Sequence, residues 1–175
     1  MSAVATPMPL KKDPLDTGIH LHTIIALVQN EAGTLNRLVS LFRRRGFSLA
    51  SLTAGDCEQP GYSRLTIVVE GDDNLLNQCL RQLEKLIDVV EVEDVKPAEA
   101  VERELALIRV EPSDENLDAV FRIADAFYAR TPRASATAYV IEVSTSPSEI
   151  ERLVAALTPY GVTEVVRSGL VAMRV

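Results

Sequence analysis

The sequence has no tryptophan, few aromatic residues, and only two cysteines and two histidines. Cys57 and Cys79 form no Cys-x-x-Cys pair, which favours reduced thiols and predicts a cytoplasmic protein. His20 and His22 share one face of an expected strand, but no third ligand stands near them in the sequence. They are interpreted as solvated histidines, and no metal site is predicted.

Long apolar runs and an excess of basic residues are also missing. The longest clean apolar stretch, 24–28, is far shorter than the ~18 residues that a membrane-spanning helix needs. Lys and Arg number 18 against 25 Asp and Glu, so the net charge of -7 disfavours nucleic acid and anionic membranes as partners. Residues 1–18 carry three prolines and no apolar core of a secretory signal, and we expect them to form a flexible tail.

Motifs of common catalytic sites are absent as well. The sequence has no G-x-S-x-G nucleophile elbow, no phosphate-binding loop and no G-x-G-x-x-G run. A small enzyme that uses Cys57 or the two histidines is therefore disfavoured, and we predict no catalytic residue in this chain.

The pattern that is present indicates a globular α+β protein. Turn signals separate short β-rich runs from two amphipathic segments. In the first amphipathic segment, Leu35, Leu38, Val39 and Phe42 recur on one helix face, and Gly46 suits a C-terminal cap. Asp72 is expected to cap the second, whose apolar stripe runs from Leu75 to Ile87. The predicted order is strand 20–29, a helix with its apolar face from Leu35 to Phe42 and its end before Gly46, strands 47–56 and 62–70, a helix with its apolar stripe at 75–87, and strand 89–95. The two middle strands are expected to form a hairpin.

The same order starts again after a linker at 96–99. The prediction is a strand at 105–110, a helix at 116–130, one or two strands at 134–144, a helix at 147–160 capped by Ser146, and one or two strands at 161–175. The segment 130–135 lacks an expected aliphatic strand. We therefore predict two tandem ferredoxin-like βαββαβ domains, at 19–96 and 97–175.

The junction between the first strand and the first helix is the strongest candidate site. Gly33 and Thr34 open the helix, where backbone N–H groups are free to meet a carboxylate. The amide of Asn30 can both donate and accept, which suits a zwitterionic amino acid. The alternative interpretation is that Asn30 and Gly33 only make a tight turn.

The run LHTIIALVQNEAGTLNRLVSLFRRRGFSLASLTAG resembles the first half of an ACT domain, a small amino-acid-sensing module. Together with PGYSRLTIVVEGDD, QLEKLIDVVEVEDV, VERELALIRV and YGVTEVVRSGLVAM, the ordered set resembles the small regulatory subunits of acetolactate synthase.

This resemblance implies a chain with no activity of its own that binds a large thiamine-diphosphate-dependent subunit. It implies that the chain raises the activity of that subunit and confers feedback inhibition by valine or another branched-chain amino acid. Thiamine diphosphate, magnesium and FAD would belong to the large subunit. The holoenzyme would be a transferase of branched-chain amino acid biosynthesis.

The resemblance also places the effector at the interface of a homodimer. Matching positions are Asn30, Gly33 and Leu35 of one chain, with Ser48 and Leu49 of the other. The family commonly has asparagine where this chain has Ser48, so the loss of one hydrogen bond is expected to weaken effector binding by ~1.5–3 kcal/mol unless water bridges the gap.

Two further alternatives follow from the residues. The chain could be a free-standing amino-acid sensor for another partner, such as a transcription regulator. Arg43, Arg44 and Arg45 could dock an acidic surface of a catalytic subunit, or they could simply be solvated cations at the end of a helix.

Overall fold

A computed structural model describes residues 18–135 and 137–175, so the predicted tail lies almost entirely outside the described residues. The order is β1 (His20–Gln29), α1 (Thr34–Arg45), β2 (Ser48–Asp56), β3 (Tyr62–Gly71), α2 (Asp73–Leu83), β4 (Val89–Val95), η1 (Pro97–Glu99), β5 (Ala100–Val110), η2 (Asp114–Asn116), α3 (Leu117–Ala126), β6 (Arg130–Ala134), β7 (Tyr139–Thr145), α4 (Pro147–Leu157), η3 (Thr158–Tyr160), β8 (Val162–Arg167) and β9 (Val171–Arg174).

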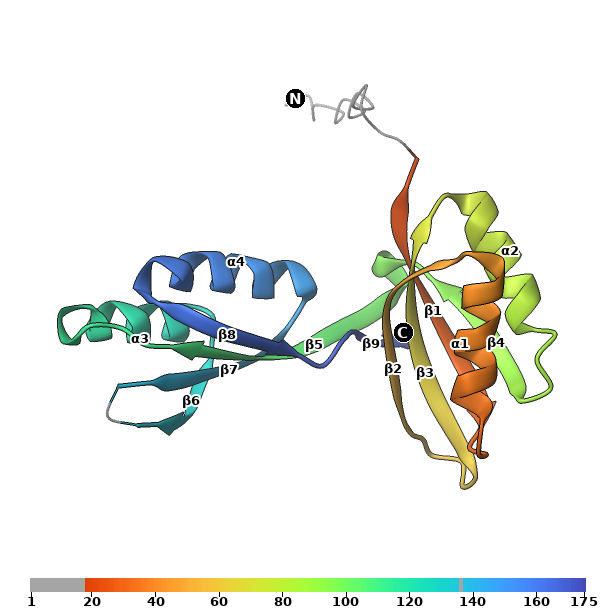
Figure 1. The fold of residues 1–175 in the computed structure, drawn as a ribbon, viewed down its shortest axis with the longest axis horizontal. Helices are drawn as coiled ribbons and strands as arrows, with labels where there is room; N and C mark the ends of the chain where they lie inside the picture. Colours follow the sequence, from red (N-terminus) through yellow and green to blue (C-terminus); the bar gives the residue numbers. More distant parts are fainter. Residues whose placement is uncertain (1–17, 136) are drawn as a thin grey trace, which may run out of the picture.

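The N-terminal half is an antiparallel sheet in the order β2-β3-β1-β4, and α1 and α2 cover one face of it (Figure 1). The predicted hairpin of β2 and β3 is confirmed. Asp72 caps α2 as expected, because its carboxylate accepts a 2.8 Å hydrogen bond from the Leu75 N–H. The core between sheet and helices contains the fully buried side chains of Ile24, Leu38 and Leu65.

The C-terminal half repeats this arrangement. Its strands follow the order β6-β7-β5-β8, and α3 and α4 cover one face of the sheet (Figure 1). A separate core holds Ile108, Ile141 and Leu153. The Ser146 hydroxyl accepts a hydrogen bond from the Glu149 N–H at the start of α4, as predicted. The predicted fold class, two tandem ferredoxin-like α+β domains, is confirmed.

Strands β5 and β9 join the two halves (Figure 1). The first part of β5 pairs with β9, and the second part pairs with β7 and β8. Ala172 of β9 is buried against the far face of the N-terminal sheet, and its N–H donates a 3.2 Å hydrogen bond to the Thr66 hydroxyl. Thr66 of β3 is therefore buried by residues more than one hundred positions away.

The predicted apolar face of α1 needs a correction. The helix buries Leu38, Leu41 and Phe42, whereas Leu35 and Val39 are each 45% exposed. Each helical residue is rotated by ~100° about the axis from the one before it. This rotation places Leu35 and Val39 beside the buried face rather than at its centre. The helix thus carries an apolar pair that its own domain does not cover.

Three predicted boundaries are also wrong. Helix α2 ends at Leu83, and the Ile87 side chain is 87% exposed rather than part of a buried stripe. Strand β5 starts at Ala100, five residues early. Helix α3 ends at Ala126, and the segment that lacks an aliphatic pattern forms the edge strand β6. Because β6 pairs with one neighbour only, its exposed arginines and its proline are tolerated there.

Candidate functional site

The turn between β1 and α1 has the tight geometry that its sequence predicts. Gly33 adopts φ 94° at the N-cap of α1, in the left-handed region that favours glycine. The Asn30 N–H donates a 2.8 Å hydrogen bond to the Gly61 carbonyl, which ties the turn to the β2–β3 loop. The turn therefore has a fixed backbone that joins two loops at one end of the sheet.

One predicted donor of this turn is already used. The Thr34 N–H donates a 3.2 Å hydrogen bond to the Glu31 carbonyl, and the Thr34 side chain is buried. The expectation that the Thr34 N–H is free for a ligand is therefore wrong. The N–H groups of Leu35 and Asn36 also belong to the first helical turn, which supplies them no intrahelical acceptor, and they are the better candidates.

A cavity of about 240 Å³ opens at this turn. It contains four of the predicted effector-binding residues, Asn30, Gly33, Thr34 and Leu35. Sequence reasoning missed its other lining residues, which are Val28, Gln29, Glu31, Asn36, Ala54, Ser63 and Leu65. The lining thus combines one carboxylate, three amides and two hydroxyls with aliphatic side chains. This set matches a small molecule that has both a cationic group and an apolar part.

An ion pair behind the turn was not predicted. Arg37 of α1 donates from Nε and Nη2 to the Asp88 carboxylate, with 2.8 Å between Nη2 and Oδ1. Asp88 is buried and precedes β4, and its carbonyl accepts a 2.8 Å hydrogen bond from the Gln29 N–H. The hydrogen bond to Asp88 raises the pKa of Arg37. The pair fixes α1 against the end of β1, and it positions the turn without lining the cavity.

The remaining predicted residues, Ser48 and Leu49, do not line this cavity. Both lie at the start of β2, an edge strand of the sheet, and the Ser48 hydroxyl donates a 3.4 Å hydrogen bond to Glu70. Ala54, near the other end of β2, is the residue of this strand that lines the cavity. Within one chain, the structure therefore groups the four turn residues and leaves the two β2 residues apart from them.

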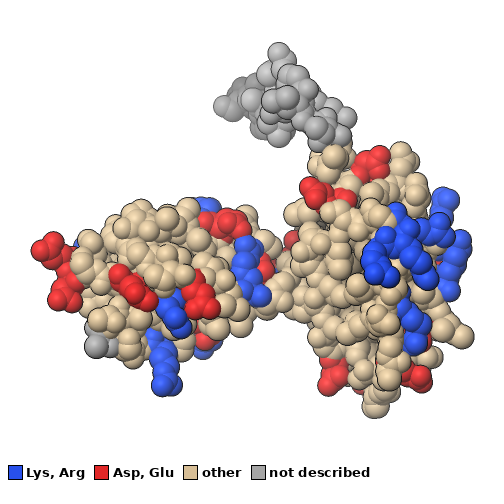
Figure 2. Space-filling model, in the orientation of Figure 1, with Lys and Arg blue, Asp and Glu red and all other residues tan. Residues whose placement is uncertain are grey.

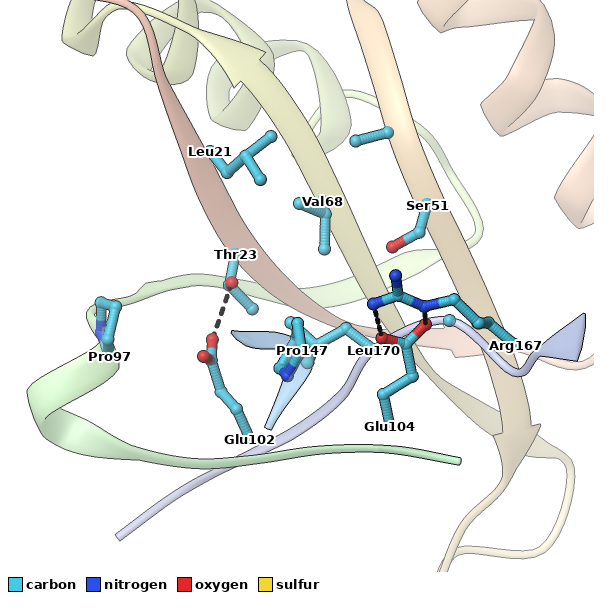
Figure 3. Close-up of a pocket in the computed structure, with 12 residues that line it drawn as sticks. Leu21, Thr23, Ser51, Val68, Pro97, Glu102, Glu104, Pro147, Arg167 and Leu170 are labelled. Atoms are coloured by element: carbon cyan, nitrogen blue, oxygen red, sulfur yellow. Dashed lines mark hydrogen bonds and ion pairs between the residues drawn. The ribbon is translucent and has the colours of Figure 1, made fainter. Parts of the chain in front are cut away.

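A larger cavity, of about 550 Å³, lies where the two domains meet (Figure 3). Leu21, Thr23 and Val68 of the N-terminal sheet face residues of the C-terminal domain, among them Glu104 and Arg167. These polar groups already bind one another. The Thr23 hydroxyl donates a 2.9 Å hydrogen bond to Glu102, and Arg167 Nε donates a 3.0 Å hydrogen bond to buried Glu104.

The hydrogen bonds in the larger cavity indicate that it is a structural contact between the two domains. The hydrogen bond to Glu104 raises the pKa of Arg167. A ligand there would have to compete with this pair. The smaller cavity at the β1–α1 turn is therefore the better candidate for a small-molecule site.

Neither cysteine belongs to a reactive cluster in the described part of the chain. Cys79 lies in the N-terminal core, where burial raises the pKa of its thiol to about 12. The Cys57 thiol lies near the Gln59 carbonyl, at 3.7 Å, and His22 Nε2 lies 3.0 Å from the Gly71 carbonyl. In the described ranges, no helix is long and apolar enough to cross a membrane, and no group of three or more His, Cys, Asp or Glu side chains could hold a metal.

Comparison with known proteins identifies the family. Residues 24–91 match the family described as the AHAS small subunit-like ACT domain, and residues 103–175 match the family described as the small subunit of acetolactate synthase. A probable acetolactate synthase small subunit of Archaeoglobus fulgidus is 41% identical over 152 residues, which cover 87% of this chain and 95% of that protein. The acetolactate synthase small subunit of Aquifex aeolicus is 38% identical over 167 residues, covering 95% of this chain and 87% of that protein.

A solved structure agrees with these relatives. The small subunit of acetolactate synthase from Thermotoga maritima is 37% identical and superimposes with a TM-score of 0.83, covering 89% of this chain and 97% of that one. The predicted resemblance is confirmed over both domains: the chain belongs to the family of acetolactate synthase small subunits, whose N-terminal ACT domain has a regulatory role.

Proposed function

We propose that the chain binds the catalytic subunit of acetolactate synthase, raises its activity and makes it subject to feedback inhibition by valine or another branched-chain amino acid. The observation that carries this proposal is the cavity at the β1–α1 turn of an ACT domain, in a chain of this family. In this proposal the chain acts in the cytoplasm and supplies no catalytic residue, while thiamine diphosphate, magnesium and FAD belong to the catalytic subunit.

The chemistry of the cavity suggests how an amino acid would lie in it. The carboxylate of Glu31 would attract the ammonium group, and the N–H groups of Leu35 and Asn36 with the Asn30 amide would receive the carboxylate. The aliphatic side chain would then contact Ala54. An apolar lining of this kind favours a branched-chain side chain, because a polar side chain would find no hydrogen-bonding partner there.

A homodimer would complete the site. Strand β2 has a free edge in the described chain, and an antiparallel pairing of two copies of β2 would be symmetric. Such pairing brings the start of one strand beside the end of the other, so Ser48 and Leu49 of the second copy would lie near Ala54 and the cavity. The exposed apolar pair of α1, Leu35 and Val39, would gain a partner surface in the same dimer.

Regulation would then follow from linkage. An amino acid that contacts both copies stabilises the arrangement in which both contacts are made, and it disfavours other arrangements. A catalytic subunit that is active with only one of these arrangements would respond to the amino acid without any contact between effector and active site.

Reconstitution tests the proposal. The chain is mixed with the cognate catalytic subunit, and acetolactate formation is followed with and without valine, leucine and isoleucine. We expect stimulation by the chain and inhibition by at least one of the three amino acids. An absence of stimulation at every ratio would refute the proposal, and co-purification with an unrelated protein such as a transcription regulator would favour the alternative of a free-standing sensor.

Sedimentation tests the dimer. The wild-type chain should sediment as a dimer at micromolar concentration, and Val39→Asp should weaken the dimer because it places a carboxylate in the apolar contact. A wild-type monomer, with or without amino acid, would contradict the two-chain site.

A further inference from the structure

Five cations lie at or just after the C-terminal ends of the two helices of the ACT domain. Arg43, Arg44 and Arg45 occupy the last turn of α1, Arg81 lies in the last turn of α2, and Lys85 follows that helix. All five side chains are exposed. The surface view shows Lys and Arg gathered over this part of the molecule (Figure 2). We call this group the basic surface.

Among the described residues, the basic surface forms no ion pairs. Many other arginines pair with carboxylates, namely Arg37, Arg64, Arg109, Arg130, Arg152, Arg167 and Arg174. Within residues 18–135 and 137–175, none of the five cations of the basic surface forms an ion pair. This concentration of unpaired positive charge contrasts with the net charge of -7 of the whole chain.

A hollow of about 350 Å³ lies within the basic surface, between α1 and the end of α2. Arg44, Arg45 and Lys85 line it together with Gln82, Leu41 and Leu86, and no carboxylate contributes to the lining. The next residue along the chain, Ile87, has an 87% exposed side chain. Positive charge therefore surrounds a hollow with an apolar floor, beside an uncovered isoleucine.

The helix dipole explains only part of this arrangement. Cations in the last turn of a helix interact favourably with its negative end, which accounts for single residues such as Arg43 or Arg81. It does not account for the convergence on one hollow of Arg44 and Arg45 from α1 and Lys85 from the segment after α2, where the cations repel each other. Repulsion of this kind is relieved when a negatively charged surface covers the group.

The chemistry favours a protein surface over other anionic partners. Phosphate groups bind preferentially at helix N-termini, whereas the cations here lie at the C-terminal ends of helices. Single-stranded nucleic acid is commonly held by aromatic stacking, and neither a phenylalanine nor a tyrosine lines the hollow. An acidic protein surface that also presents an apolar side chain would match both the charge and the apolar floor.

We propose that the basic surface docks an acidic surface of the catalytic subunit of acetolactate synthase, with an apolar side chain of that subunit in the hollow. This inference rests on the proposed function, because it takes that subunit as the partner. Helix α1 carries the effector cavity at its N-terminal end and the basic surface at its C-terminal end, about 18 Å apart for its 12 residues. The two sites are therefore separate and can be changed independently.

A charge reversal with a matched control tests the surface. The test variant combines Arg44→Glu, Arg45→Glu and Lys85→Glu. The control variant combines Lys96→Glu, Arg122→Glu and Arg133→Glu, which are equally exposed and equally free of ion pairs in the described part of the chain. Both variants change the net charge by the same amount, so a general effect of charge cancels between them.

The readout is the concentration of small subunit that gives half-maximal stimulation of the catalytic subunit. At low ionic strength we expect the test variant to raise this concentration about 10-fold or more and the control to change it less than about 2-fold. The difference should shrink in high salt, because screening weakens charge attraction. Calorimetry with valine should give the same affinity for both variants and the wild type, which reports an intact effector site.

Three results would overturn the inference. Equal behaviour of test and control variants would exclude the basic surface as the docking site, while stimulation by the wild type would leave the proposed function standing. A test variant that changes the dimer in sedimentation but stimulates normally would assign the surface to contact between copies instead. An absence of stimulation by the wild type refutes the proposed function itself, and the docking surface with it.

Discussion

The two domains share their backbone plan down to single hydrogen bonds. At the end of the first strand of each domain, a backbone N–H reaches the turn before the last strand. Gln29 donates to the Asp88 carbonyl at 2.8 Å, and Glu111 donates to the Gly161 carbonyl at 2.9 Å. The register between first and last strand also shifts near this point in both domains. The repeated fold therefore includes the same backbone hydrogen bond in both domains, although the side chains around it differ.

The side chains at this shared position differ. In the N-terminal domain Asp88 binds Arg37 and so fixes the turn that lines the candidate cavity. In the C-terminal domain the same position is Gly161, which has no side chain and adopts φ 90°. The residue before the first helix also differs between the domains: Gly33 precedes α1, whereas Asn116 precedes α3. In the described chain, the carboxylate and the glycine that shape the candidate site of the first domain are thus not repeated at these positions of the second.

The largest expected effect tests whether the two cores are independent. Leu38→Ala empties a fully buried position of the N-terminal core, and Leu153→Ala does so in the C-terminal core. Each should lower the free energy of unfolding by about 3 kcal/mol. Because the cores are separate clusters, each variant should shift the thermal transition of its own domain in calorimetry. Val90→Ala, at an exposed position, is the control, and an equal shift of a single transition by both variants would contradict independence.

The two left-handed glycines give the next comparison. A Cβ at residue 161 would lie 2.8 Å from the Glu111 carbonyl oxygen, which is fixed backbone. A Cβ at residue 33 would lie 3.1 Å from Arg37 Nη1, the end of a flexible side chain. Both substitutions also strain φ. Gly161→Ala should therefore cost about 2–3 kcal/mol and Gly33→Ala about 1–2 kcal/mol in chemical denaturation. The reverse order would show that displacement of Arg37 matters more than the backbone clash.

The effector site gives a prediction about binding. Asn30→Ala should weaken valine binding by about 1–3 kcal/mol, because it removes a hydrogen-bonding amide beside a charged ligand. Stability should change little, since this side chain is exposed. Ser48→Asn should strengthen binding if the shorter hydroxyl is what weakens it. Calorimetry measures both effects, and unchanged affinity in a folded Asn30→Ala variant would leave Asn30 and Gly33 with a role in the turn only.

Local signals explain what could be predicted of the fold and the site. The bounds of β1 and β4 were predicted to the residue, since a turn signal ends the apolar run of β1 and valines alternate with acidic residues along β4. Asn30, Gly33, Thr34 and Leu35 line one cavity because they are neighbours in sequence. Whether they bind an effector, and whether Ser48 and Leu49 join them, stay predictions.

Long-range packing explains what could not be predicted. Arg37 and Asp88 are 51 positions apart, and neither residue type signals the pairing. Thr66 looks like an exposed strand residue until β9 covers it. The strand at 130–134 has no aliphatic pattern because it lies at an edge, so its pairing with β7 decides its structure.

The smallest expected effect concerns the N-terminal domain alone, because both cysteines lie in it. Burial raises the pKa of Cys79 from 9.0 to about 12 in the folded chain. Between these values the unfolded thiol loses its proton while the folded one keeps it, so the stabilising effect is full below about pH 9 and is lost as the pH rises toward 12. The free energy of unfolding of the N-terminal domain should thus fall by about 1 kcal/mol more in the wild type than in Cys79→Ala between pH 7 and pH 10. The cavity left by the alanine lowers stability equally at both pH values and cancels in this difference. If the free energies of unfolding of the two proteins change equally with pH, the Cys79 thiol ionises as readily in the folded chain as in the unfolded one.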